Sequence, residues 1–485
     1  MESRAEHRYR LTLDGKPGSD WTTLTSRAQE RRVRQGIGRD SMDLEVSPLY
    51  LAELRAAGLQ IVTKSRWLNT VVVMRKDGTE VDDWSQLAFV TKVEMLTTTQ
   101  RASVPEPAMA DLRKANAIDS DDCSAPLTQV NALVPLYEAG YRGQGMLVAV
   151  LDAGFQNVDR WSWLMERVVG ACDLYLPLSG QDRTYTADMH GSCCLSIMAS
   201  PQSHGVWGTA QEAQYYLVRT ETDRSETQLE EDMWVAGAEL ADSLGADVIS
   251  SSLGYTTFDD DLDSHSVEQF CQGATQISRG AQAAACKGIL VCNAAGNEGN
   301  KAWLRLLFPA DVEEVLTVGG VTPQGTAVNF TSRGFLTPYV KPDVSARANH
   351  CYTVSTSGSA VSTGAGTSYA TPLIAGLCAS LWSAVPSLTA EQLREAVRQS
   401  ASRWSAPDSI VGYGIPDFGK ALTLAREMTG EEQAIEPINA DAPQGDTGIS
   451  YYNLMGQPLE GKPCSGMIYL RRRSNRQNGK SFQQR

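Results

Sequence analysis

Residues 146–154 read Met-Leu-Val-Ala-Val-Leu-Asp-Ala-Gly, an apolar run that ends in a carboxylate and a glycine. A continuous apolar run of this length is typical of a strand buried on both faces, as in a parallel sheet. Further strand-like runs lie at 214–219, 246–251, 288–292 and 315–318. Helical patterns separate several of them, near 226–243, 267–285, 368–383 and 389–400. The alternation predicts an α/β fold, with a mostly parallel sheet covered by helices on both faces.

Four polar side chains stand where these strands end or where helices begin. Asp152 ends the first run, His190 precedes Gly-Ser and an apolar helical stretch, and Asn297 follows the run at 288–292. Ser368 lies in Gly-Thr-Ser-Tyr-Ala-Thr-Pro, residues 366–372. Sites in α/β sheets form at the carboxyl ends of the strands, so we expect these side chains to share one site. A carboxylate, an imidazole, an amide and a hydroxyl are the groups that acyl transfer by a serine requires.

Each residue also has a structural interpretation when it is taken alone. Asp152 could cap a turn, Asn297 could be a turn asparagine, and Ser368 could be a helix N-cap. The histidines narrow the choice, because the chain has only five: His7, His190, His204, His265 and His350. His204 is also followed by a glycine but lacks a following helix. We therefore predict His190 as the base.

The motifs and their order, Asp, His, Asn and Ser, resemble those of the subtilisin-like serine peptidases (subtilases). The resemblance implies that Ser368 attacks the peptide carbonyl and that His190 takes and returns the proton. It also implies that Asp152 orients the imidazole and that Asn297, with the backbone N–H of Ser368, stabilises the oxyanion. We expect Pro372 to be tolerated in the first turn of the helix that begins at Ser368.

The segment Ser252-Leu253-Gly254 resembles the strand of this family that pairs with the substrate backbone. With Ala295 and Gly296, it would wall the first specificity pocket. These residues indicate an apolar pocket. Tyr255 follows where the family often has glycine, which leaves the depth of the pocket open.

The N-terminal part reads as a separate small α/β unit. Strand-like runs at 9–13, 60–64, 69–75 and 92–97 and helical runs near 48–57 and 83–88 give the order βαββαβ. This ferredoxin-like order resembles the propeptides of subtilases, which implies a domain that inhibits its own peptidase. We expect Arg27, Arg31, Arg32 and Arg34 to form a solvated helix face. Residues 98–126 read as an exposed linker that proteases can cut.

The last part of the chain differs in composition. An acidic spacer at 431–448 precedes Tyr-Asn-Leu-Met-Gly-Gln (452–457) and Gly-Met-Ile-Tyr-Leu (466–470). These phrases resemble the C-terminal sorting tail of proteins exported by the type IX secretion system, and a small β-hairpin is the alternative. The predicted domains are therefore 1–120 (propeptide-like domain and linker), 121–430 (subtilisin-like peptidase) and 431–485 (spacer and tail).

Bulk composition excludes some partners. The net charge of −14 argues against nucleic acid and anionic membranes, and no apolar run approaches the length of a membrane span. The start of the sequence lacks a secretory signal, and we expect that the signal has been omitted from it. The ten cysteines are interpreted as small buried apolar residues, with disulfides left open. We expect no metal ligands and no cofactor in the chemistry; a structural calcium ion at Asp-Asp-Asp-Leu-Asp (259–263) is weighed against a solvated acidic loop, which we favour.

These observations together predict a secreted or cell-surface serine endopeptidase. Its expected partners are protein or peptide substrates, its own propeptide as inhibitor, and secretion machinery that recognises the tail. One alternative is a catalytically silent binding or adhesion module with the same fold. Another is an esterase or transacylase that uses the same site.

Overall fold

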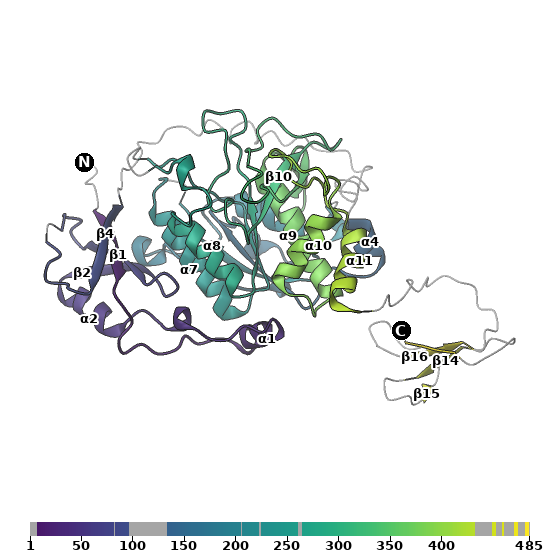
Figure 1. The fold of residues 1–485 in the computed structure, drawn as a ribbon, viewed down its shortest axis with the longest axis horizontal. Helices are drawn as coiled ribbons and strands as arrows, with labels where there is room; N and C mark the ends of the chain where they lie inside the picture. Colours follow the sequence, from purple (N-terminus) through teal and green to yellow (C-terminus); the bar gives the residue numbers. More distant parts are fainter. Residues whose placement is uncertain are drawn as a thin grey trace. The chain divides into compact units, whose positions relative to one another are not determined.

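The computed structural model describes residues 7–81, 83–96, 133–204, 206–222, 225–259 and 264–431, together with four short strands between 449 and 484. The chain divides into two compact units, residues 1–425 and 426–485. The first unit holds a seven-stranded parallel sheet and a smaller antiparallel sheet (Figure 1).

The predicted parallel sheet is confirmed. Its strands are β5 (Leu147–Asp152), β6 (Val168–Asp173), β7 (Gln214–Arg219), β8 (Val248–Ser251), β9 (Leu290–Ala294), β10 (Leu316–Val321) and β11 (Val344–Arg347). They lie in the order β11-β10-β9-β8-β5-β7-β6, and every pairing is parallel. The strand order changes direction beside β5, which is where open α/β sheets form their sites.

Helices cover both faces of this sheet. The helices that follow the N-terminal domain are α4 (Leu133–Glu138), α5 (Leu176–Ser179), α6 (His190–Ala199), α7 (Leu229–Leu244), α8 (Gln276–Cys286), α9 (Thr367–Ala384), α10 (Ala390–Ser400) and α11 (Phe418–Thr429). Single 3₁₀ turns occur at Val158–Arg160, Met165–Arg167, Gln202–His204 and Val267–Gln269, and β12 (Cys351–Val354) pairs with β13 (Val361–Gly364) as a hairpin. The helix expected from residue 267 begins only at Gln276, because the chain forms a short turn and a loop before the N-cap Thr275.

The side chains of β5 explain why the sheet is buried on both faces. Leu147, Ala149 and Leu151 join a core cluster with residues of α7 and α8 such as Trp234 and Ile277. The alternate residues of the same strand point to the other face and are also buried. The strand thus holds its terminal carboxylate, Asp152, within a rigid and dry part of the fold.

The N-terminal domain is a four-stranded antiparallel sheet. Its elements are β1 (Arg8–Leu13), α1 (Ser26–Arg34), a 3₁₀ turn (Ser41–Asp43), α2 (Pro48–Ala56), β2 (Leu59–Ser65), β3 (Thr70–Arg75) and β4 (Val90–Leu96). The strand order β2-β3-β1-β4 is that of a ferredoxin-like sheet. The second predicted helix, at 83–88, is wrong: the described residues there form turns, in which the carboxylate of Asp83 accepts the N–H of Ser85.

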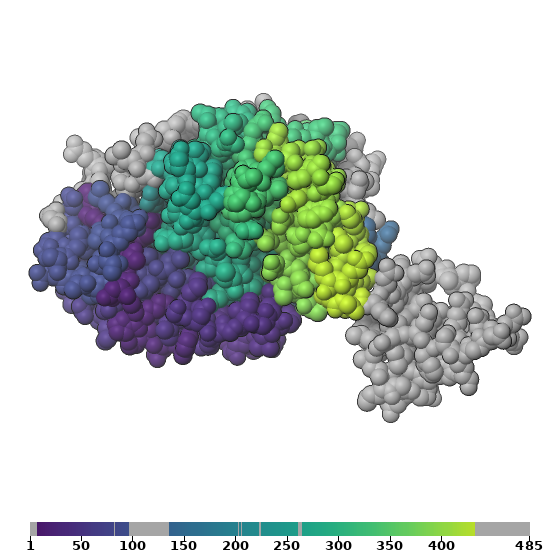
Figure 2. All heavy atoms as spheres, in the orientation of Figure 1, coloured from purple at the N-terminus to yellow at the C-terminus, as the bar shows by residue number. Residues whose placement is uncertain are grey.

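Both faces of this small sheet are covered. Val71 and Val73 pack with Leu54 of α2 in the domain's own core. Val72 and Met74, which alternate with them along β3, pack with Met233 of α7. The sheet therefore lies directly on α7, and Figure 2 shows the two parts forming a continuous surface.

The arginines of α1 are not a solvated face, contrary to our expectation. Arg31 and Arg32 are buried, and both bind the carboxylate of Asp242 near the end of α7, at 2.5 and 2.6 Å. Arg27 and Arg34 pair with Asp247, just after that helix. Cations suit this place because the C-terminal end of a helix carries partial negative charge. The name "arginine anchor" is used below for α1 with these four arginines.

Loss of one buried arginine should destabilise the folded chain. Arg31→Ala removes one of three arginines that bind the buried carboxylate of Asp242, and Arg32 and Arg66 remain, so we expect the free energy of unfolding to fall by about 1–3 kcal/mol. Arg34→Ala is the matched control, because Arg34 is 36% exposed and its pair should contribute no more than about 1 kcal/mol. Urea denaturation of the full chain measures both. Equal effects would show that burial of the pair does not matter.

The second unit contains a four-stranded antiparallel sheet, in the order β15-β14-β16-β17. Its strands are β14 (Ile449–Tyr452), β15 (Pro458–Leu459), β16 (Leu470–Arg473) and β17 (Ser481–Gln484). Residues 453–457 and 460–469, which hold most of the sorting-like phrases, lie outside the described residues. None of the helices that the structure describes has both the length and the apolar character needed to cross a membrane.

Candidate active site

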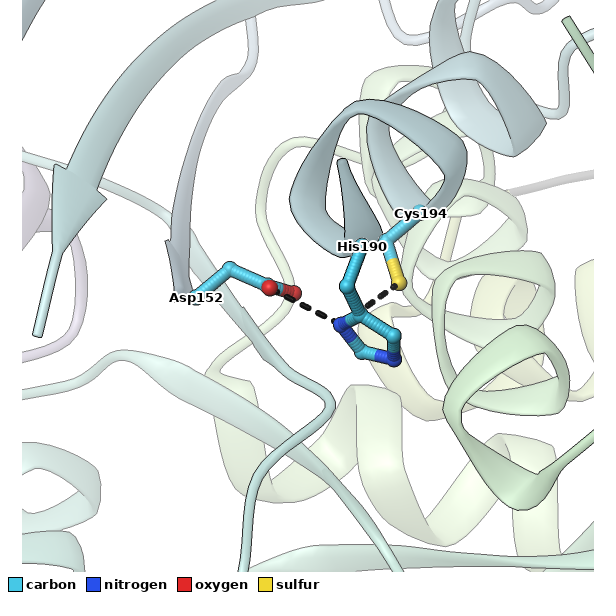
Figure 3. A group of neighbouring side chains, drawn as sticks. All are labelled: Asp152, His190 and Cys194. Carbon is cyan, nitrogen blue, oxygen red and sulfur yellow. Dashed lines mark hydrogen bonds and ion pairs between the residues drawn. The ribbon is translucent and has the colours of Figure 1, made fainter. Parts of the chain in front are cut away.

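Asp152 and His190 form a hydrogen-bonded pair at the carboxyl end of β5. The Nδ1 atom of His190 lies 2.8 Å from Oδ1 of Asp152, whose side chain is fully buried (Figure 3). The same oxygen accepts the N–H of Ala153 at 2.8 Å. Gly191 allows helix α6 to come this close, because a Cβ at that position would lie 2.9 Å from Cβ of Asp152. The pair therefore depends on the His-Gly sequence and on the strand that ends in aspartate.

The environment of His190 favours its charged form. Burial lowers the pKa of the imidazole, but the attraction of the Asp152 carboxylate, together with smaller contributions, outweighs it and raises the pKa well above 6.5. The ring is 18% exposed, so it is open to the solvent on one side while it faces the carboxylate on the other. Its Nδ1 atom is held as a donor by that carboxylate, which leaves Nε2 as the atom able to accept a proton.

The raised pKa sets the direction of the pH dependence. Only the neutral imidazole can accept a proton from a serine, so kcat/KM should rise with pH as His190 loses its charge. Because the pKa is raised, we expect the midpoint of this rise to lie above pH 6.5. His204→Ala should leave the profile unchanged. A midpoint below 6.5 would show that Asp152 does not dominate the environment of the ring.

Ser368 is the second residue of α9, whose N-cap is Gly366. Gly366 has a φ of 146°, a backbone conformation that residues with a side chain rarely adopt. The glycine therefore permits the backbone conformation from which the helix begins. As a residue of the first turn, Ser368 has a backbone N–H without an acceptor in its own helix. A negative oxygen near this helix start would meet that N–H.

Pro372 lies in the second turn of α9, not the first as expected. A proline there has no N–H for the carbonyl of Ser368 four residues earlier. That carbonyl instead accepts the hydroxyl of Ser252 at 2.7 Å and the thiol of Cys194 at 3.3 Å. The proline thus ties the helix that carries Ser368 to the segment after β8 and to α6.

The hydroxyl of Ser368 donates to the carbonyl oxygen of Ser252 at 3.4 Å. Within the described part of the chain, it makes no hydrogen bond to His190. Catalytic hydrogen bonds are often long or misaligned before substrate binds, and a change of χ1 is enough to turn a serine hydroxyl. Cys194 links the two parts of the site, because its Sγ atom lies 3.3 Å from the carbonyl oxygen of Ser368 and 3.9 Å from Nδ1 of His190.

Asn297 is fixed next to the start of α9. Its Oδ1 atom accepts the N–H of Thr367 at 2.9 Å and the hydroxyl of the same residue at 3.1 Å. The carbonyl oxygen is occupied in this way, while the Nδ2 donor has no hydrogen bond to the part of the chain that the structure describes. A Cβ built at Gly366 would lie 3.6 Å from Nδ2, which places this donor along the approach to Ser368.

The expected substrate segments also meet at this site. Leu253 and Ala295 are buried, and the amide of Asn293 donates to the Leu253 carbonyl at 3.0 Å. The two glycines, Gly254 and Gly296, face the same side chain, because a Cβ at either would come within about 2.6 Å of Leu307. Sequence reasoning missed Leu307, since no motif marks it.

The other histidines in the described part of the chain do not join this site. His204 contacts the hydroxyl of Ser203 at 3.1 Å and the ring of Trp163. His265 pairs with Glu231 at 2.9 Å, in a setting buried among aromatic rings. His190, unlike His204, contacts the carboxylate of Asp152 among the described residues, and its role as the base stays a prediction.

Cys194 is a neighbour of the site that sequence reasoning did not assign to it. Its Sγ atom lies 3.9 Å from Nδ1 of His190. The spacing of four residues gave a signal, because residues i and i+4 of a helix lie on the same face. The eight cysteines that the structure describes are all unpaired. Most of those expected to be buried are so, but Cys286 is exposed.

The expectation for calcium is not tested, because residues 260–263 lie outside the described residues. The described residues contain one group of metal-ligating side chains that lie close together, namely Asp152, His190 and Cys194. It is considered further below.

Comparison with known proteins identifies the family of this chain. Residues 143–414 match the Subtilase family (peptidase S8), and residues 15–110 match the peptidase S8 propeptide domain of Bacteroidota. The chain therefore belongs to the subtilase family of serine endopeptidases, and it carries that family's propeptide domain.

Individual relatives are distant in sequence. The chain is 27% identical to subtilisin DY of Bacillus licheniformis over 277 residues, which cover 56% of this chain and 90% of that protein. It is 29% identical to subtilisin E of Bacillus subtilis (strain 168) over 270 residues, which cover 55% of this chain and 63% of that protein. Among solved structures, a protease from Pseudoalteromonas arctica PAMC 21717 is similar at 22% identity with a TM-score of 0.48, covering 60% of this chain and 93% of that one.

Proposed function

We propose that this chain is a secreted zymogen of a serine endopeptidase that cleaves through Ser368, His190 and Asp152. The observation that carries the proposal is the 2.8 Å contact between His190 and the buried Asp152, beside the helix start that presents Ser368. In this mechanism Ser368 attacks the peptide carbonyl, while Nε2 of His190 takes its proton and later returns it to the leaving amine. Asp152 keeps the ring in the orientation that leaves Nε2 free and stabilises its charged form.

We assign oxyanion stabilisation to two donors, Nδ2 of Asn297 and the backbone N–H of Ser368. Both lie at the start of α9, and the amide of Asn297 is preorganised by its bonds to Thr367. A preorganised donor costs no rearrangement when the charge develops, so it acts mainly on the transition state.

Removal of the Asn297 side-chain amide should therefore lower the turnover rate more than it weakens substrate binding. We expect Asn297→Ala to lower kcat by ~10²–10³, a magnitude known from the equivalent donor of subtilisin and carried over here. KM should change little, because the oxyanion forms only near the transition state. Steady-state kinetics on a peptide substrate measures both quantities. A large rise in KM with an unchanged kcat would instead indicate a structural turn residue.

The N-terminal domain would act as the inhibitor of its own enzyme until the linker is cut. Its sheet lies on α7, and its last strand, β4, ends at Leu96, so the chain enters the linker directly from the docked sheet. We propose that Ser368 itself cuts the linker between residues 98 and 126. Delivery outside the cell through the C-terminal tail is part of the same proposal.

The substrate would be a peptide or protein with an apolar residue before the cleaved bond. Leu253 and Ala295 supply apolar walls, and Leu307 packs against Gly254 and Gly296. The leucine side chain of Leu307 would fill part of this pocket and make it shallow. We therefore expect medium-sized apolar residues to be accepted better than large aromatic ones.

A serine-reactive phosphonate tests the function directly. The purified protein should gain one phosphonate adduct, on the peptide that contains Ser368. Its activity on a mixed peptide library should fall in proportion to the fraction of protein that is labelled. A silent adhesion module would not be labelled. An esterase or transacylase would be labelled but would leave the library intact.

A further inference from the structure

Three different ligand types meet at one face of His190. The groups are the carboxylate of Asp152, Nδ1 of His190 and the thiol of Cys194, and one ligand atom from each lies within 4.8 Å of the others. Figure 3 shows the carboxylate and the sulfur both directed at the imidazole. Asp152 and Cys194 are almost completely buried, and the 18% exposure of His190 leaves one side of the group open.

The group also contains unused binding capacity. Oδ2 of the fully buried Asp152 has no hydrogen-bond partner among the described residues. A buried carboxylate oxygen without a partner is costly, so it favours the arrival of a donor or a cation. Besides its 3.9 Å contact with Nδ1 of His190, the thiol of Cys194 makes weak contacts at 3.5 Å to the hydroxyl of Ser252 and 3.3 Å to the carbonyl of Ser368.

We propose that Asp152, His190 and Cys194 form an inhibitory binding site for a thiophilic divalent cation of the zinc type. This inference rests on the proposed function, because the ion would inhibit by coordinating His190, the proposed catalytic base. A sulfur, an imidazole nitrogen and a carboxylate oxygen are the ligands that zinc takes in proteins, and a solvent molecule can complete four-coordination.

The distances suit a single ion. Bonds of about 2.0 Å to nitrogen and 2.3 Å to sulfur allow an ion to bridge ligand atoms separated by up to about 4.3 Å. Nδ1 and Sγ are 3.9 Å apart, and Nδ1 and Oδ1 are 2.8 Å apart. Small side-chain rotations are therefore enough to place all three atoms around one ion.

The mechanism of inhibition follows from the protons. The ion binds the lone pair of Nδ1, so the proton held there by Asp152 moves through solvent to Nε2, and the thiol releases its proton to water. Nε2 then carries a hydrogen and cannot accept one from Ser368. The ion is held at Nδ1, whereas Ser368 depends on Nε2 of the same ring, so turnover should fall with little change in substrate binding.

Zinc titration of the mature enzyme tests the site. Activity is measured against buffered free Zn²⁺ for the wild type, Cys194→Ala and Cys194→Ser, each relative to its own rate in a chelator. We expect Zn²⁺ to lower kcat of the wild type with KM little changed, and the chelator to reverse the effect. Both variants should need at least about tenfold more Zn²⁺ for half inhibition. Cys286→Ser is the matched control, because Cys286 is an exposed thiol on α8, and this variant should behave like the wild type.

Two results would overturn the proposal: inhibition of the Cys194 variants at the same Zn²⁺ as the wild type, or a wild type that Zn²⁺ does not inhibit. A chain without peptidase activity in the chelator would contradict the proposed function instead. Binding can then be measured separately, by adding Co²⁺ to the full chain carrying Ser368→Ala. We expect the Ser368→Ala protein to show a thiolate-to-cobalt absorption band, and the Ser368→Ala/Cys194→Ala double variant to lack it. Absence of the band in the Ser368→Ala protein would refute the site.

Discussion

Ser368→Ala should abolish peptide hydrolysis and leave the fold intact. The change removes one hydroxyl whose only bond among the described residues is a 3.4 Å contact to Ser252, so circular dichroism should be unchanged. We expect kcat to fall by ~10⁶, a magnitude known for removal of the nucleophile in subtilisin and carried over here. Self-cleavage should stop as well: the wild type should run as two fragments separated between residues 98 and 126, and the variant as one chain.

Ser362→Ala provides the matched control. Ser362 lies on β13, only six residues before Ser368, and its hydroxyl contacts that of Thr353 at 2.9 Å. This variant should be active and processed. If Ser368→Ala is still cut at the same bond in a host without other proteases, the linker is not cut by Ser368, although the catalytic assignment could remain.

His190→Ala should cause a loss similar to that of Ser368→Ala. Without the imidazole no group accepts the serine proton, and in subtilisin the loss of the base lowers kcat by ~10⁶, about as much as loss of the nucleophile. His204→Ala should retain activity, because His204 contacts Ser203 and Trp163 and no carboxylate of the described residues. The kcat of each variant on one peptide substrate checks the pair. The reverse pattern, an active His190→Ala and a dead His204→Ala, would show that the wrong histidine was chosen.

The parallel sheet was predictable because its central strands are apolar on both faces. β5 and β7 were located to within one residue, since the local pattern alone reports burial on both sides. β6 was not predicted. It is one of the two edge strands of the sheet, and its mixture of exposed and half-buried residues does not resemble a buried run.

The burial of the α1 arginines could not be read from the sequence. Arg31 is an ordinary surface residue by its local pattern, and its partner Asp242 is 211 positions away. The same limit applies to the site. Each motif marked its own residue, but the contact of Leu307 with Gly254 and Gly296 depends on how three loops fold together. Cys194 was not assigned to the site, because its contact with the Ser368 carbonyl arises only where Pro372 frees that carbonyl.

The arginine anchor has a consequence for the timing of activation. The N-terminal domain holds α7 at two places, through its sheet near Met233 and through Arg31 and Arg32 at Asp242. If the linker is cut as proposed, the severed domain can dissociate only when both contacts with α7 are broken at the same time. While one is held, the other rebinds at an effective concentration of about millimolar, so the complex should outlive either contact by orders of magnitude. Cutting the bond would then start a delay, and its length could change through residues on α1 without any change in the catalytic residues.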